Sequence, residues 1–84
     1  MKHCMITFRS VTPAQRGEGI LKKAAIGVNL GRTPRQMQEK GCGYSLRLPC
    51  RELPQALALL RRYGIAFQKV YTLGEDGTAE ERTL

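Results

Sequence analysis

Residues 44–63 read YSLRLPCRELPQALALLRRY, a strand pattern followed directly by a helix pattern. The stretch opens with alternating apolar and polar side chains, which is typical of a strand with one buried face. Pro49 ends this strand because proline lacks a backbone donor. Residues 51–63 then predict a helix, and Gly64 suits the position just beyond its end. The inward-facing residues of this helix are predicted to be Leu53, Ala56, Leu57 and Leu60.

The same order of strand and helix occurs at the N-terminus. Residues 3–8 alternate in the strand manner. Thr12 is followed by Pro13, and Gln15 completes the form of a capping box with proline in the first turn. We therefore expect a helix from here to about Ala25. Its inner stripe is predicted to contain Ala14, Gly17, Leu21 and Ala24.

Two glycines interrupt this first helix. Gly17 and Gly19 should each weaken it by roughly 1 kcal/mol relative to alanine. Glu18 and Lys22, one turn apart, should form a stabilising pair on its outer side.

The remaining elements follow from shorter patterns. Gly27 should end the first helix, and Val28 and Leu30 mark a short second strand. Residues 31–43 form a long, polar and basic connection, which in so small a domain is more often functional than idle. Residues 65–71 are predicted to close the domain as a fourth strand.

The resulting order, β-α-β-β-α-β, predicts the α+β class. With right-handed crossovers it favours a ferredoxin-like sandwich, a four-stranded antiparallel sheet with two helices on one face. We assign residues 1–73 to this single domain and residues 74–84 to an acidic tail without fixed structure. So small a core supplies only about 3 to 5 kcal/mol, so a homodimer would add stability.

Charge is unevenly distributed along the chain. Residues 1–74 hold thirteen of the fourteen lysines and arginines but only three acidic residues, whereas residues 75–84 hold four acidic residues and one arginine. A basic body can attract RNA, an acidic protein or a small anion. No apolar run approaches the roughly 20 residues that span a bilayer, and the N-terminus lacks a signal-like apolar segment. We therefore expect a cytoplasmic protein with no membrane partner.

The sequence contains few residue patterns that would indicate a hydrolytic active site or a metal site. The sequence offers no set of serine, histidine and acid, and no paired carboxylates before the tail. A zinc site is not expected, because His3 and Cys4 point to opposite faces of a strand and no cysteines have short ligand spacing. The glycines around Glu18 do not form a phosphate loop.

Nucleic acid is a weaker alternative. An RNA-recognition sheet stacks bases on aromatic side chains of its central strands. The outward positions of the first and third strands instead carry Met5, Thr7, Ser45 and Arg47. Binding to the RNA backbone alone stays open.

The strongest chemical signal is a cysteine between two glycines. Gly41-Cys42-Gly43 follows a basic stretch that includes Arg32, Arg35 and Lys40. Glycine on both sides exposes the sulfur, and nearby cations favour thiolate over thiol. The alternative interpretation of Cys42 is a small hydrophobic residue at the start of a strand.

The predicted fold adds a second source of positive potential. If the third strand runs antiparallel beside the first, Cys42 lies near the N-terminus of the first helix. Amides at Ala14 and Gln15 and the helix dipole would stabilise an anionic sulfur there. Arg9 and Arg16 flank the same corner.

The other two cysteines are expected to be structural. Three cysteines without a Cys-x-x-Cys spacing do not make the even framework of a small secreted fold, so reduced thiols are expected. Cys42 and Cys50 lie about 26 Å apart along the third strand, too far for a bridge, which needs Cα atoms about 4 to 7 Å apart. A contact between Cys4 and Cys50 is open, but burial of both as small apolar residues is favoured.

Several motifs together resemble a small bacterial family of selenium or sulfur carrier-like proteins, long described as a domain of unknown function. A similar domain occurs in selenium-metabolism proteins that also carry a TusA-like domain. The resemblance covers roughly residues 4–72. The motifs are Thr7-Phe8-Arg9-Ser10, Thr12, Thr33-Pro34-Arg35 and Cys42-Gly43-Tyr44-Ser45-Leu46-Arg47. The chain departs from the family pattern at Gly17 and Gly19, where the first helix is usually richer in alanine, leucine and glutamate.

The resemblance implies a carrier that holds sulfur or selenium on Cys42 as a persulfide or selenosulfide, with donor and acceptor proteins as partners. We interpret the protein as such a carrier rather than a turnover enzyme, with no metal and no other cofactor. The residues expected around the sulfur are Pro34, Arg35, Gly41, Gly43, Arg9 and Arg16. The alternatives are a basic regulatory module that binds nucleic acid or protein, and a structural domain that dimerises through its open sheet face.

Overall fold

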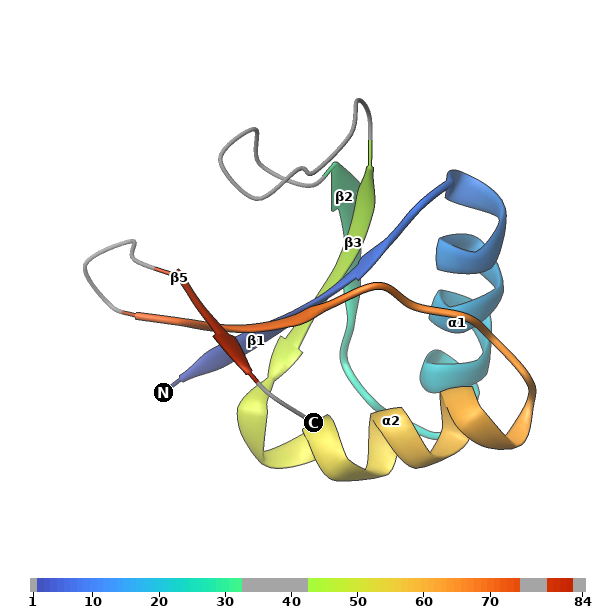
Figure 1. Ribbon diagram of the computed structural model, residues 1–84. Helices are drawn as coiled ribbons and strands as arrows, with labels where there is room; N and C mark the ends of the chain where they lie inside the picture. Colours follow the sequence, from blue (N-terminus) through green and yellow to red (C-terminus); the bar gives the residue numbers. More distant parts are fainter. Residues whose placement is uncertain (1, 33–42, 75–78, 83–84) are drawn as a thin grey trace.

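The computed structural model describes residues 2–32, 43–74 and 79–82. Within these ranges the chain forms five strands, two helices and one short 3₁₀ turn. In chain order they are β1 (His3–Phe8), α1 (Val11–Lys23), β2 (Asn29–Arg32), β3 (Tyr44–Pro49), η2 (Cys50–Glu52), α2 (Leu53–Arg62), β4 (Val70–Leu73) and β5 (Ala79–Arg82) (Figure 1).

The strands form one antiparallel sheet with the order β2-β3-β1-β4-β5, and both helices pack on one of its faces (Figure 1). The α+β class is therefore confirmed. The expected antiparallel pairing of the first and third strands is confirmed too, with Phe8 opposite Tyr44 and His3 opposite Pro49. The prediction of four strands is wrong, because the described residues form five.

The additional strand, β5, lies in the acidic segment for which the sequence predicted no fixed structure. It pairs with β4, beginning with Val70 opposite Arg82. Lys69 also forms an ion pair with Glu81, with 2.9 Å between Nζ and Oε1. The prediction failed because main-chain hydrogen bonds hold an edge strand to its neighbour, and a count of apolar residues does not register them.

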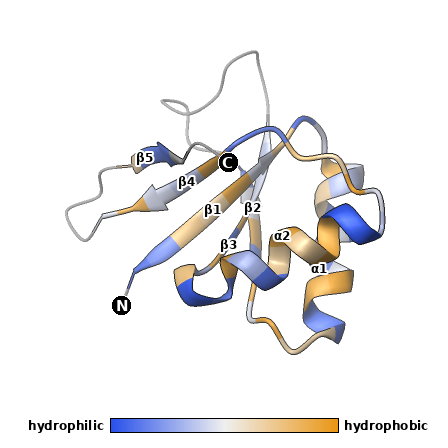
Figure 2. Ribbon diagram, turned by 60° about the horizontal axis from the view of Figure 1, so that its bottom comes forward, coloured by the Kyte–Doolittle hydropathy of each residue, from blue (hydrophilic) through white to orange (hydrophobic). Residues whose placement is uncertain are grey.

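The core lies between the sheet and the two helices. In Figure 2, β1 and both helices carry apolar segments, drawn in orange, whereas β5 is blue. The predicted inner residues of α2 are all buried, and those of α1 are buried except Ala24, which is partly exposed. The largest fully buried side chains are Phe8, Ile6, Leu21, Leu46, Leu48, Leu60, Val70 and Cys4.

Gly17 allows α1 to approach both the sheet and α2 closely. A Cβ atom at this position would lie 3.1 Å from Leu60 Cδ2 and 3.3 Å from Leu46 Cδ1. At Gly19 an added Cβ would meet nothing within 4 Å. From the sequence, both glycines were predicted only to lower the stability of the helix. The structure shows that Gly17 also permits close packing, whereas Gly19 does not contribute to packing in this way.

The helix ends differ in part from the prediction. The prediction of a capping box at Thr12 is wrong, because Ser10 occupies the N-cap position and makes no side-chain hydrogen bond there. The helix ends before Gly27, with Ala25 taking the positive φ of 63°. At the second helix, Gly64 takes its expected place beyond the C-terminus with a φ of 68°.

Three element boundaries are corrected as well. Residues 50–52 form η2, so α2 begins two residues later than predicted. The second strand begins at Asn29 rather than Val28. The fourth strand begins at Val70 rather than Ile65, because the Ile65 N–H still donates to Leu60 O at 2.9 Å and so closes the end of α2.

Candidate functional site

The described residues include part of the predicted site. Gly43, Arg9 and Arg16 are described. The carrier candidate Cys42 lies outside the described residues, and so do Pro34, Arg35 and Gly41. The exposure and activation of the Cys42 thiol therefore stay predictions, and the described neighbours show what surrounds the entry to β3.

Three elements meet where β3 begins. Phe8 ends β1 opposite Tyr44, and Arg32 ends β2 opposite the same tyrosine. Gly43 directly precedes Tyr44, and α1 begins at Val11, soon after β1 ends. We call this region the arginine corner, defined by Arg9, Arg32, Gly43 and the first turn of α1.

Positive charge in the arginine corner comes from side chains and from the helix. Arg9 and Arg32 are both exposed. The first turn of α1 contains no acidic residue, and Ser10 gives it no side-chain cap. The N-terminal amides and the helix dipole therefore keep their preference for an anion. Arg16 is exposed in the second turn of α1.

Arg32 was not among the binding residues predicted from the sequence. It appeared there only as part of a basic stretch, because the register between β2 and β3 was unknown. Knowledge that Arg32 pairs with Tyr44, the residue that follows Gly43, would have identified Arg32 as a candidate binding residue.

The opposite end of β3 holds the other two cysteines. Cys4 and Cys50 form a disulfide, with their Cα atoms 4.9 Å apart. This contradicts the expectation of reduced thiols and the preference for two separately buried residues. Cys4 is 0% exposed, as expected, whereas Cys50 is only partly buried against the core.

The register of β1 and β3 explains this pairing. Cys4 lies opposite Leu48, so Cys50 follows only two positions beyond its partner. The chain stays beside β1 after β3 ends, because the Cys50 N–H donates to Lys2 O at 3.1 Å. The predicted strand pairing, combined with this register, would have revealed the bridge.

The sheet face opposite the helices is less open than the sequence suggested. Met5, Thr7 and Ser45 were expected to point outward, yet they are only 7%, 4% and 3% exposed. Tyr71, opposite Met5, is 9% exposed. Of the four outward positions considered, only Arg47 is exposed. The described part of this face therefore offers no exposed aromatic platform for stacked bases.

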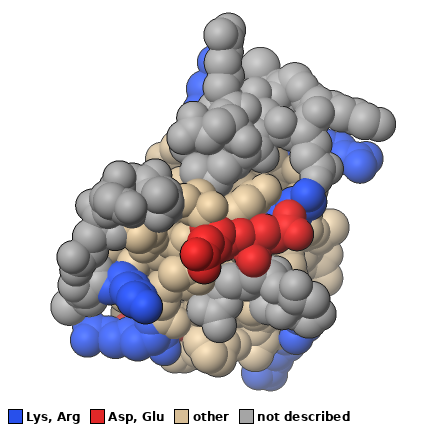
Figure 3. All heavy atoms as spheres, turned by 60° about the vertical axis from the view of Figure 1, so that its left-hand side comes forward, with Lys and Arg blue, Asp and Glu red and all other residues tan. Residues whose placement is uncertain are grey.

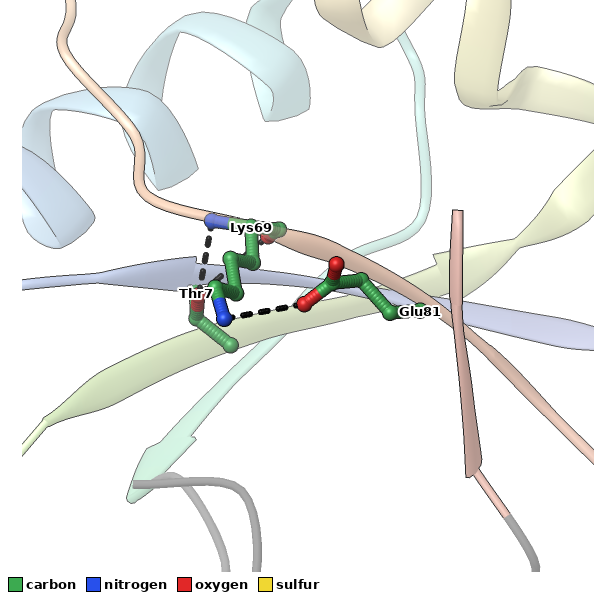
Figure 4. Close-up of polar contacts among 3 residues, drawn as sticks. All are labelled: Thr7, Lys69 and Glu81. Carbon is green, nitrogen blue, oxygen red and sulfur yellow. Dashed lines mark hydrogen bonds and ion pairs between the residues drawn. The ribbon is translucent and has the colours of Figure 1, made fainter. Parts of the chain in front are cut away.

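Thr7 is held by hydrogen bonds at this face (Figure 4). Its hydroxyl donates to Lys69 O at 3.2 Å and accepts from Lys69 N–H at 3.0 Å. The Lys69 side chain extends toward Glu81 of β5 (Figure 4).

Figure 3 shows acidic side chains gathered in one strip, with lysine and arginine side chains around it.

The rest of the described chain offers few chemical groups. A cavity of about 250 Å³ is lined by Ile20, Lys23, Ala24, Leu59 and Tyr63, which include no cysteine, serine or histidine. Within the described ranges, no three histidine, cysteine or acidic residues are arranged to hold a metal ion. No helix in those ranges is long and apolar enough to cross a membrane.

The fold and corner define a small α+β domain with a positively charged entry to its third strand. Residues 3–72 match the model of the family described as "Putative Se/S carrier protein-like". This match covers most of the chain, so the protein belongs to that family, as its motifs indicated. A comparison with curated proteins found no match.

Proposed function

We propose that the protein is a carrier of sulfur or selenium, held on Cys42 as a persulfide or selenosulfide. The observation that carries this proposal is the family match, which spans Cys42 and the motifs on both sides of it. The arginine corner supports it with a setting that favours an anionic sulfur. We also interpret β1 to β4 with the two helices as a ferredoxin-like unit extended by β5, and we expect it in the cytoplasm.

The loading step is a thiolate exchange. The Cys42 thiolate attacks the terminal sulfur of a donor persulfide, such as that of a cysteine desulfurase. A new sulfur–sulfur bond forms on Cys42, the donor's sulfur–sulfur bond breaks, and the donor leaves as a thiolate. An acceptor thiol or other nucleophile then removes the terminal sulfur in the same manner. The arginines and the helix amides stabilise the negative charge at each stage.

The location of the disulfide supports a carrier rather than a dithiol switch at Cys42. β3 runs from Tyr44 to Pro49, so its two ends lie about 16 Å apart. The Cys4–Cys50 disulfide lies at the far end from Gly43. A sulfur loaded on Cys42 would therefore have no second thiol of this domain beside it.

The alternative of a basic module that binds nucleic acid or protein gains less support. Met5, Thr7, Ser45 and Tyr71 are buried, which leaves no stacking surface at these positions. Their burial also weakens the idea of a homodimer built on this sheet face.

Intact-mass spectrometry tests the carrier proposal. The reduced protein is incubated with a cysteine desulfurase and cysteine, or with selenodiglutathione, from which the Cys42 thiolate can take selenium by expelling one glutathione thiolate. The mass is recorded before and after a reductant. We expect a reducible chalcogen adduct that Cys42→Ser abolishes and Cys50→Ala retains. Absence of an adduct, or an adduct that survives Cys42→Ser unchanged, would refute the proposal.

Binding of the protein to RNA, measured by gel shift at several salt concentrations, tests the alternative of a nucleic-acid-binding module. Binding that persists in Cys42→Ser, in a protein that takes up no chalcogen, would favour the nucleic-acid module.

A further inference from the structure

The two cysteines of the disulfide differ in burial. Cys4 lies within β1 and is completely buried in the core. Cys50 begins η2 beyond the end of β3 and is partly exposed. Cys50 is therefore the more exposed residue of the pair.

Backbone hydrogen bonds hold the two segments together in addition to the covalent bond. β1 and β3 pair along their whole length, from His3 opposite Pro49 to Phe8 opposite Tyr44. The hydrogen bond from Cys50 N–H to Lys2 O continues that pairing past the strand end. These bonds would keep the two segments paired after the disulfide opens, so both thiols would stay near each other. In the disulfide-bonded structure, Cys4 Sγ lies 3.9 Å from Thr72 Oγ1.

We propose that Cys4 and Cys50 form a redox-active pair, separate from Cys42, in which Cys50 is the attacking sulfur and Cys4 the buried resolving sulfur. The pair cycles between dithiol and disulfide by exchange with small disulfides and thiols. Its two Cα atoms lie 4.9 Å apart in the disulfide-bonded structure, within the ordinary range for disulfides.

The oxidation proceeds in two exchange steps with a small disulfide such as oxidised glutathione. The Cys50 thiolate attacks one glutathione sulfur, forms a mixed disulfide and expels the first glutathione thiolate. Cys4 then loses its proton, attacks the Cys50 sulfur and expels the second glutathione. Two protein thiols are oxidised and one glutathione disulfide is reduced to two thiols. An excess of glutathione reverses both steps.

The experiment uses the reduced full chain carrying Cys42→Ser, so that only this pair can react. After incubation with oxidised glutathione, intact mass should show the loss of two hydrogen atoms and no retained glutathione. Adding Cys4→Ala should trap one glutathione on Cys50. Adding Cys50→Ala instead should leave the protein unmodified over the same time, with circular dichroism confirming that both variants fold.

Two results would overturn the proposal. One is a stable glutathione adduct when both cysteines are present, which would show that Cys4 does not resolve it. The other is glutathionylation of the Cys50→Ala variant as fast as that of the Cys4→Ala variant.

A second measurement leaves the pair itself unsubstituted. The reduced Cys42→Ser protein is alkylated briefly with iodoacetamide, and labelling is assigned by peptide mapping. Cys50 should react roughly tenfold faster than Cys4 or more, because Cys4 becomes accessible only when β1 opens locally. Equal rates at the two positions would also contradict the proposed roles.

Discussion

The two ends of β3 present opposite settings for sulfur chemistry. At its start, the arginine corner combines Arg9 and Arg32 with the uncapped first turn of α1. At its end, Cys4 and Cys50 lie together against the core. Under the proposed function, a cationic site at which the described residues place no second thiol favours a thiolate that keeps its cargo. An adjacent thiol instead favours disulfide formation and release of the cargo. Neighbours, rather than the cysteine itself, decide which chemistry a sulfur performs.

The largest effect that we expect from this difference is on the retention of a persulfide sulfur by Cys50. A persulfide placed on Cys50 should be discharged by Cys4, which attacks the inner sulfur and expels hydrosulfide while the disulfide forms. The Cys42→Ser protein should therefore keep no sulfur but release sulfide, and Cys4→Ala in that background should retain the adduct. Mass spectrometry combined with a sulfide assay measures both quantities. Retention of sulfur on Cys50 with Cys4 intact would break the comparison between the two ends.

The next largest effect concerns stability. The disulfide joins residues 46 positions apart, so in the chain-entropy estimate it stabilises the fold by about 4 kcal/mol. Cys50→Ala should lower the free energy of unfolding by about that amount under oxidising conditions and by under about 1 kcal/mol with a reductant present. Urea unfolding in both conditions measures the difference, with Cys42→Ser as the control that should show no loss. Equal losses in both conditions would mean that the bridge does not stabilise the protein in solution.

A smaller effect tests how α1 is held beside the arginine corner. Gly17→Ala gains helix propensity but crowds Leu60 and Leu46, whereas Gly19→Ala gains propensity without a contact. We expect Gly19→Ala to raise the free energy of unfolding by about 0.5 to 1 kcal/mol. Gly17→Ala should be less stable than Gly19→Ala by about 1 to 3 kcal/mol because of overpacking. Urea unfolding of the matched pair decides this, and equal stabilities would show that the packing adjusts freely.

The smallest effect concerns the cations of the arginine corner. Arg9→Gln and Arg32→Gln should each slow alkylation of Cys42 by roughly twofold to threefold at low salt, because a weaker positive potential lowers the thiolate fraction. The same substitution at Arg61, an exposed residue at the end of α2, serves as the matched control and should have little effect. Iodoacetamide kinetics measure the rates. If all three variants react alike, the corner does not activate the thiol.

Local patterns in the sequence determined much of the fold. The alternation in residues 3–8 and 44–49 and the apolar spacing in α2 are properties of short segments, so the strands, the helix and their inner faces could be predicted. The family motifs likewise stand in the sequence itself, and the match over residues 3–72 confirms them. The chemistry proposed for Cys42 comes from the same local signals.

Only the tertiary structure decided which distant residues meet. β5 depends on the edge that β4 offers, and the role of Gly17 depends on Leu60 and Leu46 packing against it. The Cys4–Cys50 bridge depends on a register in which one slipped residue would turn the side chains to the other face. Such contacts join segments far apart in the chain, and their free energy depends on geometry that no local pattern contains. The sequence by itself therefore identified the family and the carrier cysteine as a candidate, while the fold paired the other two cysteines.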